Sequence, residues 1–406
     1  METVIIVGAG AAGLAAARRL QHAGLSPLIL EARPRIGGRI KTDRTYGPVE
    51  LGAEFIHGPQ ARTWEFVRSA GLQTAPWGSD RRFAWGGQLV TLDDPRAAGV
   101  LTLYQAVAGY NGPELSVADL LDRLAAKDDP AATLARRWFG NLEGADLNVL
   151  SAAAFAAEHA ASTNGEGNFH ILDGYDRLIA HLAEGLRIRL EAPVTQIVWN
   201  EISATLTLAD GEQLSARHVI ITAPLGVLQA GLIAFAPALP VAKQNALHAI
   251  PMGSVTKLAL WFDRQLWPDF TVLSTDGQIA TWWPVESATT PTLMGYQGGK
   301  IAQAIAQLGE AAAIEAGLHD LEQLFGPEVR AACLGGRLAD WAADPWSRGA
   351  YSYSAVGMGT ARAVLAEPLA TTLFFAGEAV ATGGHLATVH GALESGEQAA
   401  NKILAL

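Results

Sequence analysis

A glycine-rich turn near the start of the chain constrains the fold more than any other feature. Residues 3–7 form a continuous apolar run, as in a strand that is buried on both faces. Three glycines in G-x-G-x-x-G spacing follow it: Gly8, Gly10 and Gly13. Residues 14–23 have helix-forming composition, and a second apolar run, residues 28–30, ends at Glu31. This order of strand, turn, helix, strand and acid predicts a Rossmann-like dinucleotide-binding unit.

Each residue of the motif has a physical reason. Gly8 allows the tight turn, Gly10 lets a pyrophosphate approach the backbone, and Gly13 allows the helix to pack closely on the strand. The free N–H groups at the helix start attract phosphate oxygens. Glu31 is expected to accept hydrogen bonds from the adenosine ribose. The alternative is a tight strand–helix turn that binds no ligand.

A basic, glycine-rich loop follows the second strand, with the sequence R-I-G-G-R: Arg35, Ile36, Gly37, Gly38 and Arg39. A guanidinium pairs with phosphate in a bidentate manner, and glycines let the backbone come close. A single arginine is usually a solvated surface charge. Because this loop is expected beside the pyrophosphate, Arg39 is predicted to bind it.

Composition and charge limit the class of protein. The 406 residues are too many for one simple core, so two domains are expected. Half of the chain is apolar and 17% is charged, which favours a large folded interior. The net charge of -11 argues against a nucleic-acid partner, because phosphate binding needs a basic face. The single cysteine, Cys333, excludes an intramolecular disulfide and a cysteine-built metal site.

The sequence also bears on location. We find no uninterrupted apolar run of about eighteen residues, so no membrane span is expected. The first residues already belong to the glycine motif and do not have the pattern of a signal peptide. The default expectation is therefore a cytoplasmic protein.

The chain resembles the FAD-dependent amine oxidase family, which includes monoamine oxidases, polyamine oxidases and the catalytic core of lysine-specific histone demethylases. The R-x-G-G-R loop points to FAD rather than NAD. Further matching stretches recur along the chain: ELGAEFIHG (50–58), ITAPLGVL (221–228), DPWSRGAYSY (344–353) and FFAGEAVATGGHLATVHGALESGEQAA (374–400).

The resemblance implies an α/β fold in which two domains interleave. A Rossmann-like FAD-binding domain with a parallel sheet would use three segments: 1–76, 165–240 and 345–406. An α+β substrate-binding domain would use 77–164, expected to be helical, and 241–344. Within the second of these, residues 300–325 are expected to be helical up to Gly326-Pro327.

The resemblance also implies a set of FAD contacts: Gly8, Gly10, Ala12, Gly13, Glu31, Arg33, Gly38, Arg39, Gly52, Ala53, Glu54, Val194, Trp341, Gly377, Glu378, Thr388 and Val389. Among these, Trp341 has ordinary core packing as an equal alternative. Residues 388–404 read as a helix whose start points at the flavin ring. A positive helix end there stabilises the negative charge of reduced flavin.

Lys257 stands in the middle of an apolar strand, MGSVTKLALWF (252–262). Alternation places Lys257 on the face opposite Leu258, Leu260 and Phe262. From the residues alone, a lysine on a solvated face is the ordinary interpretation. The resemblance implies a different role, in which the lysine lies under the flavin and holds a water near its N5 atom.

The resemblance further implies a cage of aromatic side chains around the amine. Tyr351 matches one cage position, and Thr388 stands where monoamine oxidases have the second tyrosine. Ala350 stands where they carry the cysteine that bonds to FAD, so non-covalent FAD is predicted. Phe55 and His57 are predicted to line the substrate pocket, although His57 could equally be a surface histidine. The predicted catalytic set is thus Lys257, Tyr351 and Thr388, with no metal.

The implied reaction is amine oxidation to an imine, with hydride transfer to flavin N5, O2 reduced to H2O2, and hydrolysis of the imine to an aldehyde or keto product. The partners are a small amine, such as a polyamine, and O2. Two alternatives stay open: an FAD enzyme acting on carbon–carbon bonds, such as a desaturase or a protoporphyrinogen oxidase-like enzyme, and a flavin-binding protein without turnover. A chromatin demethylase is disfavoured, because no long helical insertion is found in the sequence.

Overall fold

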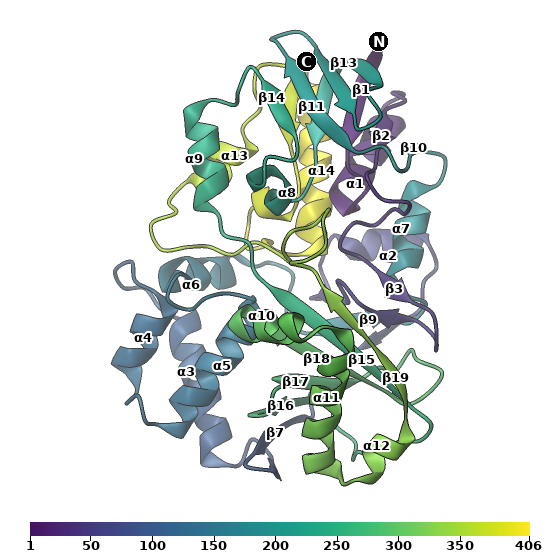
Figure 1. The fold of residues 1–406 in the computed structure, drawn as a ribbon. Helices are drawn as coiled ribbons and strands as arrows, with labels where there is room; N and C mark the ends of the chain where they lie inside the picture. The colour runs from purple at the N-terminus through teal and green to yellow at the C-terminus, as the bar shows by residue number, and fades with distance from the viewer.

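The computed structural model describes residues 1–406 and divides most of its strands between two large sheets (Figure 1). The first sheet contains strands from distant parts of the chain, in the spatial order β10 (Arg187–Arg189), β2 (Leu28–Leu30), β1 (Glu2–Val7), β13 (Gln213–Ile221), β12 (Ala204–Leu208), β11 (Val194–Trp199) and β14 (Ala234–Ala236), while β20 (Leu373–Phe375) also pairs with β13. β1 pairs in parallel with β2 and β13, and β13 pairs in parallel with β20. β12 leads through a turn at Gly211 into β13 and pairs with it in the antiparallel direction.

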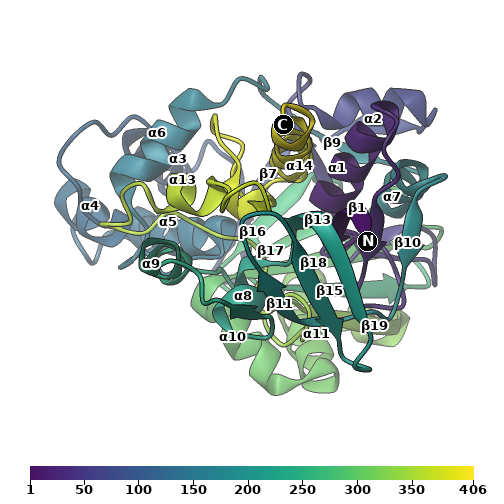
Figure 2. The same ribbon diagram turned by 90° about the horizontal axis from the view of Figure 1, so that it is seen from above.

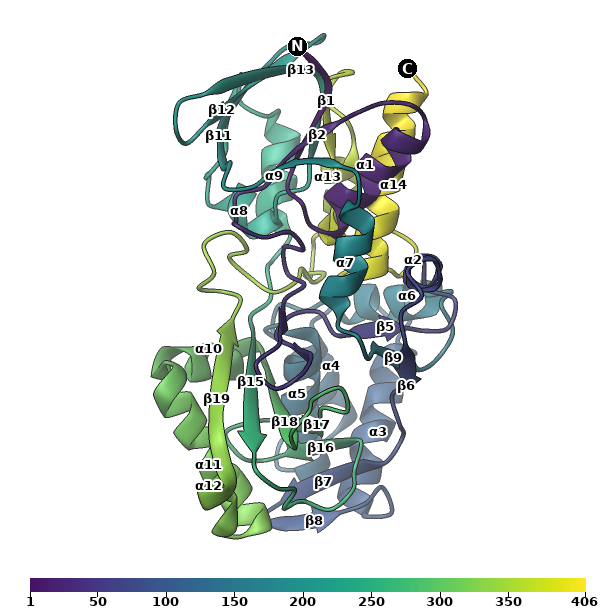
Figure 3. The ribbon, with the colours of Figure 1, turned by 90° about the vertical axis from the view of Figure 1, so that its right-hand side faces the viewer.

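The second sheet has seven strands, in the order β19 (Cys333–Asp340), β15 (Val255–Phe262), β18 (Thr292–Gly298), β17 (Thr281–Pro284), β16 (Val272–Thr275), β7 (Arg81–Trp85) and β8 (Gln88–Val90). Two small sheets lie near it: β3 (Thr42–Asp43) with β4 (Val49–Glu50), and β5 (Phe55–His57) with β9 (Asn168–Ile171) and β6 (Thr74–Pro76). Seen from the side in Figure 3, the first sheet and the second sheet occupy opposite ends of the molecule.

Helices surround both sheets. Those of the first half of the chain are α1 (Ala11–His22), α2 (Thr63–Ser69), α3 (Pro95–Ala108), α4 (Val117–Leu124), α5 (Pro130–Glu143), α6 (Ala152–Ala161) and α7 (Tyr175–Ala183). Those of the second half are α8 (Leu225–Gln229), α9 (Val241–Ala249), α10 (Gly299–Leu308), α11 (Glu310–Phe325), α12 (Glu328–Ala332), α13 (Ala361–Ala366), the 3-10 turn η1 (Glu378–Val380) and α14 (Val389–Leu404). None of them is both long and apolar enough to span a lipid bilayer.

The glycine turn takes the predicted shape. Gly8 has a φ of +108°, a region that only glycine enters readily. A Cβ on Gly13 would lie 2.0 Å from the carbonyl oxygen of Gly8, so only glycine permits this approach of α1 to β1. A Cβ on Gly10 would meet nothing within 4 Å, which leaves open space in front of the turn.

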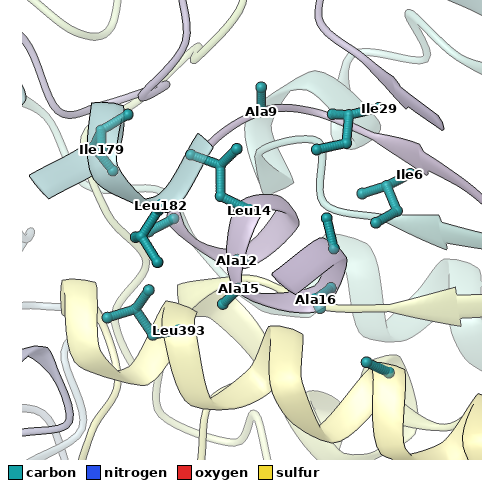
Figure 4. Packing of buried hydrophobic residues seen from close by; sticks show 14 of the residues in the cluster. Ile6, Ala9, Ala12, Leu14, Ala15, Ala16, Ile29, Ile179, Leu182 and Leu393 are labelled. Carbon is teal, nitrogen blue, oxygen red and sulfur yellow. The ribbon is translucent and has the colours of Figure 1, made fainter. Parts of the chain in front are cut away.

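The first and last helices of the chain pack side by side (Figures 2 and 4). Alanines on one side of α1 contact α14 around Leu393, which has no exposed surface. A Cβ on Gly396 would lie 2.1 Å from the carbonyl oxygen of Ala12. Small side chains thus let the two helices approach closely, and their N-termini are brought toward the same edge of the first sheet.

The second sheet is buried on both faces at β15, whose eight residues are all buried. Leu258, Leu260 and Phe262 belong to the core under α10–α12, whereas Ala259 and Trp261 pack with Val49, Leu51 and Trp283 on the other face: this division is the one that alternation predicts. Lys257 shares the second face, so the solvated-face interpretation is wrong.

Two expectations about the substrate segments are wrong in detail. The segment 77–164 is not helical throughout, because it begins with a hairpin, β7–β8, that turns at Gly86 and Gly87 with positive φ at both. The helix expected over 300–325 is two helices, because Gly309 adopts a φ of +77° between α10 and α11. The domain boundaries stay a proposal, which the separation into two sheets supports.

Candidate active site

The glycine turn and the end of β2 form one cluster. Glu31 is buried, and its two carboxylate oxygens accept the backbone N–H groups of Ala9 (2.7 Å) and Arg33 (2.9 Å). Each oxygen keeps a second lone pair for a further donor. No side chain caps α1, and its first turn carries no acidic residue. Its N–H groups therefore remain available to an anion.

The segment that leads into Val194 is hydrogen-bonded to Glu31. The backbone carbonyl of Glu31 accepts the N–H of Ala192, two residues before Val194. The structure thus brings Glu31 and Val194 together, as the predicted adenosine site requires. Their contacts with a cofactor stay a prediction.

The two loop arginines have different partners. Arg39 donates to the carbonyl oxygen of Ala350 (2.5 Å) and to Glu378 (2.9 Å), which links the basic loop to two later segments. Arg35 donates to three backbone carbonyls of its own loop, at Ile36, Gly38 and Ile40. Arg35 therefore stabilises the shape of its own loop, whereas Arg39 connects this loop to later segments of the site.

Arg33 pairs with Asp344 through two hydrogen bonds of 2.7 and 2.6 Å and also donates to Ser347. Its guanidinium thus anchors the segment that leads to Tyr351. The predicted contact of Arg33 with FAD stays a prediction.

Glu378 is a buried carboxylate held in its charged form. Burial alone raises the pKa of Glu378, but Arg39 and Arg362 outweigh burial and leave this pKa below its ordinary value. Its other oxygen accepts the N–H and hydroxyl of Ser352, at 3.2 and 2.7 Å. Next to it, Gly377 has a φ of +141°. Glu378 and Arg39 also line a small pocket at the carboxyl ends of β13 and β20, where open α/β sheets collect ligands.

The loop between β4 and β5 packs on the arginine loop. Ala53 donates its N–H to the carbonyl oxygen of Arg39 (3.1 Å), and a Cβ on Gly52 would lie 2.0 Å from that oxygen. The indole N–H of Trp341 donates to the carbonyl oxygen of Leu51 (2.9 Å). Trp341 is therefore buried against this loop and also holds it in place.

Lys257 is buried, with 4% of its surface exposed. Its ammonium donates to a carboxylate oxygen of Glu54 (2.5 Å) and to the carbonyl oxygen of Glu50 (3.0 Å). It also lies 5.5 Å from the centre of the Trp283 ring. The lysine thus joins the second sheet to the loop predicted to contact FAD.

Aromatic side chains surround this lysine. Tyr296 is its register partner on β18, and the hydroxyl of Tyr296 lies 2.6 Å from that of Tyr351. Tyr351 in turn donates to the carbonyl oxygen of Leu142 (2.7 Å). Burial raises the pKa of both tyrosines, so the phenols stay neutral. On the other side, Phe55 packs against the rings of Trp77, His170 and Trp283, among others.

Thr388 caps the last helix. Its hydroxyl accepts the N–H of Gly391 (3.0 Å) and donates to the carbonyl oxygen of His385 (2.7 Å). The side chain that stands at the second cage position therefore serves α14, and the first-turn N–H groups around Val389 point away from the helix body. Catalytic and cofactor roles for these two residues stay predictions.

His57 is exposed, and its ring lies 6.1 Å from Phe55 and 6.4 Å from His390. Its Nδ1 bonds with the Asn168 side chain (2.8 Å). The structure thus places His57 at the outer end of the aromatic group, as a residue at a pocket entrance would be.

Four residues of the site were missed by sequence reasoning: Glu143, His170, Trp283 and Tyr296. Only Tyr296 and Trp283 carried a signal, because pairing of the lysine strand with its neighbours would have placed their side chains on the lysine face. Glu143 ends α5 directly after Leu142, and burial together with Glu158 raises the pKa of its carboxyl to about 7.

The residues present fit FAD. The glycine turn leaves open space at Gly10, the start of α1 lacks a cap, and Arg39 spans the loops. The predicted contacts that would face the cofactor are only partly buried: Gly10, Gly38, Gly52, Ala53, Thr388 and Val389. Backbone that stays accessible inside the fold is what an extended dinucleotide requires.

Comparisons with known proteins agree with this geometry. The family model described as flavin containing amine oxidoreductase matches residues 11–404. Polyamine oxidase 4 of Oryza sativa subsp. japonica is 31% identical over 98% of this chain and 88% of that protein. Lysine-specific histone demethylase 2 of Homo sapiens is 29% identical over 100% of this chain and 53% of that protein.

Solved structures share the fold. Cyclohexylamine oxidase from Brevibacterium oxydans IH-35A superposes with a TM-score of 0.86 at 24% identity, over 100% of this chain and 99% of that one. Wild-type putrescine oxidase bound to putrescine gives a TM-score of 0.87 at 22% identity, again over 100% and 99%. The α/β architecture is therefore the one found in these oxidases.

Proposed function

This chain belongs to the family of flavin-containing amine oxidoreductases, and from that premise we propose that it oxidises the C–N bond of a small amine to an imine. The amine carbon gives up a hydride equivalent and the nitrogen a proton. O2 takes up two electrons and two protons to become H2O2, and water converts the imine to an aldehyde or ketone and a free amine. FAD supplies the hydride acceptor at its N5 atom when bound.

One observation carries the proposal: the buried ammonium of Lys257 lies between Glu54 and a wall of aromatic side chains, and it faces the loop that packs on Arg39. This aromatic wall consists of Phe55, Trp283, Tyr296 and Tyr351. An apolar sheet does not accommodate a lysine without reason. Two of its three N–H groups are used by protein acceptors. The third can hold a water or an oxygen species beside the flavin.

The aromatic wall favours the reactive form of the substrate. A charged amine loses hydration among Phe55, Trp283, Tyr296 and Tyr351, so the neutral amine is favoured there. Only the neutral amine has the nitrogen lone pair that assists departure of a hydride from its carbon. The two phenols stay protonated and can donate hydrogen bonds but do not act as bases.

A carboxyl near this wall supports a substrate with a second ammonium, such as a diamine or polyamine. Glu143 follows Leu142, whose carbonyl oxygen accepts the Tyr351 hydroxyl. It is half-buried and has no salt-bridge partner within the chain. The names of the polyamine oxidase relatives and of the putrescine-bound neighbour point in the same direction.

Ala350 supports non-covalent attachment of FAD. It occupies the predicted flavin-side position next to Tyr351, and alanine offers no nucleophile. After acid precipitation, the yellow colour should appear in the supernatant. A yellow pellet would contradict this part of the proposal.

A peroxide-coupled screen over monoamines, diamines, polyamines and amino acids tests the function. We expect H2O2 release and flavin bleaching under anaerobic conditions with at least one amine. If the protein binds FAD and no amine bleaches it, the alternatives of carbon–carbon oxidation or flavin binding without turnover replace amine oxidation. A panel of cyclic and acyl carbon–carbon substrates then separates these two.

A further inference from the structure

The pair formed by Glu54 and Lys257 is the most deeply buried salt bridge of the chain. The exposed fraction of the two side chains is 4% for Glu54 and 5% for Lys257, and the atoms lie 2.5 Å apart. Glu54 comes from the loop before β5, whereas Lys257 comes from the centre of the second sheet. The pair therefore connects two separate parts of the site.

Both oxygens of Glu54 have partners. One accepts the Lys257 ammonium, and the other accepts the indole N–H of Trp283 at 2.9 Å. The Nδ1 atom of His170 lies 3.5 Å from this second oxygen. The carboxylate is thus fixed in orientation from two sides, which in turn fixes the position of the lysine nitrogen.

Burial without a charged partner would change the protonation state of a lysine. An isolated ammonium in an apolar site loses hydration and tends to release its proton, which would leave a neutral amine. A carboxylate in direct contact favours the charged form and limits its rotation. With Glu54 and the carbonyl of Glu50 occupying two N–H groups, the remaining N–H has one defined direction.

We propose that Glu54 is a positioning residue for flavin reoxidation: it keeps Lys257 as a charged, oriented hydrogen-bond donor and compensates its charge beside the cofactor. Lys257 is then a donor to the oxygen species and is not an amine base. This inference rests on the proposed function in one respect, the placement of the flavin beside Lys257.

Flavin reoxidation can be measured without an amine substrate. The bound flavin is reduced chemically under anaerobic conditions and then mixed with O2, and its absorbance is followed. The midpoint potential of the flavin is measured in parallel. A failure of amine oxidation would therefore leave this test intact, and the two failures are distinguishable.

The informative range lies above neutrality, from about pH 8 to about pH 10, where an unpaired buried lysine loses its proton. Glu50 faces the pair, and burial raises the pKa of its carboxyl to about 7, so Glu50 titrates below this range. Burial raises the pKa of Tyr296 above its usual value, so Tyr296 titrates above it. His170 is present in every variant, so any effect of His170 on the pH dependence of the reoxidation rate is the same in all of them.

The wild-type reoxidation rate is expected to be flat over this range. In Glu54→Gln, which keeps an acceptor for Trp283 and removes the charge, the rate should fall by about tenfold as Lys257 deprotonates. The midpoint potential of Glu54→Gln should lie above the wild-type value at about pH 8, where the uncompensated ammonium favours reduced, negatively charged flavin, and approach that value at higher pH.

Three further variants make the test specific. Glu54→Asp keeps the charge at a longer distance and should show an intermediate loss of rate. In a Lys257→Met background, adding Glu54→Gln should produce no new pH dependence, because the carboxylate then has no ammonium to act on. Glu201→Gln, which removes an exposed carboxyl far from the pair, should keep the flat profile.

Two outcomes would overturn the inference. One is a flat profile and an unchanged potential in Glu54→Gln. The other is a pH-dependent loss that persists in the Lys257→Met background, which would mean that Glu54 acts on the flavin directly or only through the fold. If Glu54→Gln does not retain FAD, Glu54→Asp is measured in its place. The pH dependence of its reoxidation rate must then differ from that of the wild type, and an identical pH dependence would overturn the inference.

Discussion

The hydroxyl groups of Tyr296 and Tyr351 lie 2.6 Å apart, and the Tyr351 hydroxyl donates its hydrogen bond to the carbonyl oxygen of Leu142. This chain of two hydrogen bonds ties a strand of the second sheet, the segment after Trp341 and the end of α5 into one wall. It also sets Glu143 at the rim of that wall. The position of this carboxyl leads to the first prediction.

Glu143→Gln should raise KM for diamines and polyamines by about tenfold, while KM for monoamines of similar length stays within about twofold. The reason is that a distal ammonium gains an interaction with a carboxylate and none with an amide. Because the pKa of Glu143 is about 7, the wild-type KM for diamines should fall as the pH rises through 7 and the carboxyl ionises. Steady-state kinetics with a diamine and its monoamine analogue check both effects. Equal changes for the two substrates would contradict the role.

Gly10→Ala and Gly13→Ala form a matched pair. An alanine Cβ at Gly10 meets nothing within 4 Å, so the unfolding free energy of the apoprotein should change by less than about 0.5 kcal/mol. FAD affinity should nevertheless fall, because the Cβ projects where the pyrophosphate approaches. At Gly13 the Cβ would lie 2.0 Å from Gly8, and crowding of this kind costs about 1–3 kcal/mol.

Urea unfolding of the apoproteins and fluorescence titration with FAD separate these two effects. The opposite pattern, a destabilised Gly10→Ala and an unaffected Gly13→Ala, would show that the turn does not have the described packing.

Glu50→Gln should stabilise the protein at alkaline pH. Burial raises the pKa of this carboxyl from 4.5 to about 7, so the folded state favours its neutral form. That preference is fully present below about pH 4.5 and is lost as the pH rises through about 7. Above this value the charged carboxylate costs up to about 3 kcal/mol, which a neutral glutamine avoids.

Unfolding in urea at about pH 5 and about pH 8 should show a gain for Glu50→Gln mainly at the higher value. The exposed Glu201→Gln variant is the control and should show no such difference. A gain of equal size at both values would mean that the charge of Glu50 is not its cause.

Lys257→Met should retain FAD and slow the reaction of reduced flavin with O2 by at least about tenfold. The variant should also be less stable, because an unpaired buried carboxylate costs about 3–5 kcal/mol unless Glu54 takes up a proton. The FAD content, the melting temperature and the rates of both half-reactions are the measurements. Unchanged rates in both half-reactions would exclude a role for the lysine in turnover.

Local patterns predict local structure in this chain. The spacing of Gly8 and Gly13 follows from contacts within a single strand–turn–helix unit, and both glycines are placed as expected. Alternation along β15 likewise predicts which face carries Lys257. The hairpin at Gly86 and Gly87 was missed, because the alanine-rich helices that follow dominate the composition of its surroundings.

The pairing of side chains from distant segments could not be predicted in the same way. Glu54 and Lys257 are separated by 203 residues, and no pattern in the loop of Glu54 or in the strand of Lys257 indicates the other. The same holds for Trp283 on β17 and His170 on β9, which meet Glu54 only because strands of two different sheets lie beside the loop before β5. The family resemblance supplied candidate residues, whereas their partners within the chain required the structure.

The first sheet is built from both ends of the polypeptide, since β20 pairs with β13 and α14 packs along α1. A nascent chain leaving the ribosome therefore lacks one wall of its nucleotide site until α14 has been made. Stable insertion of the flavin must then await synthesis of α14, and truncations within α14 should accumulate as apoprotein bound to chaperones.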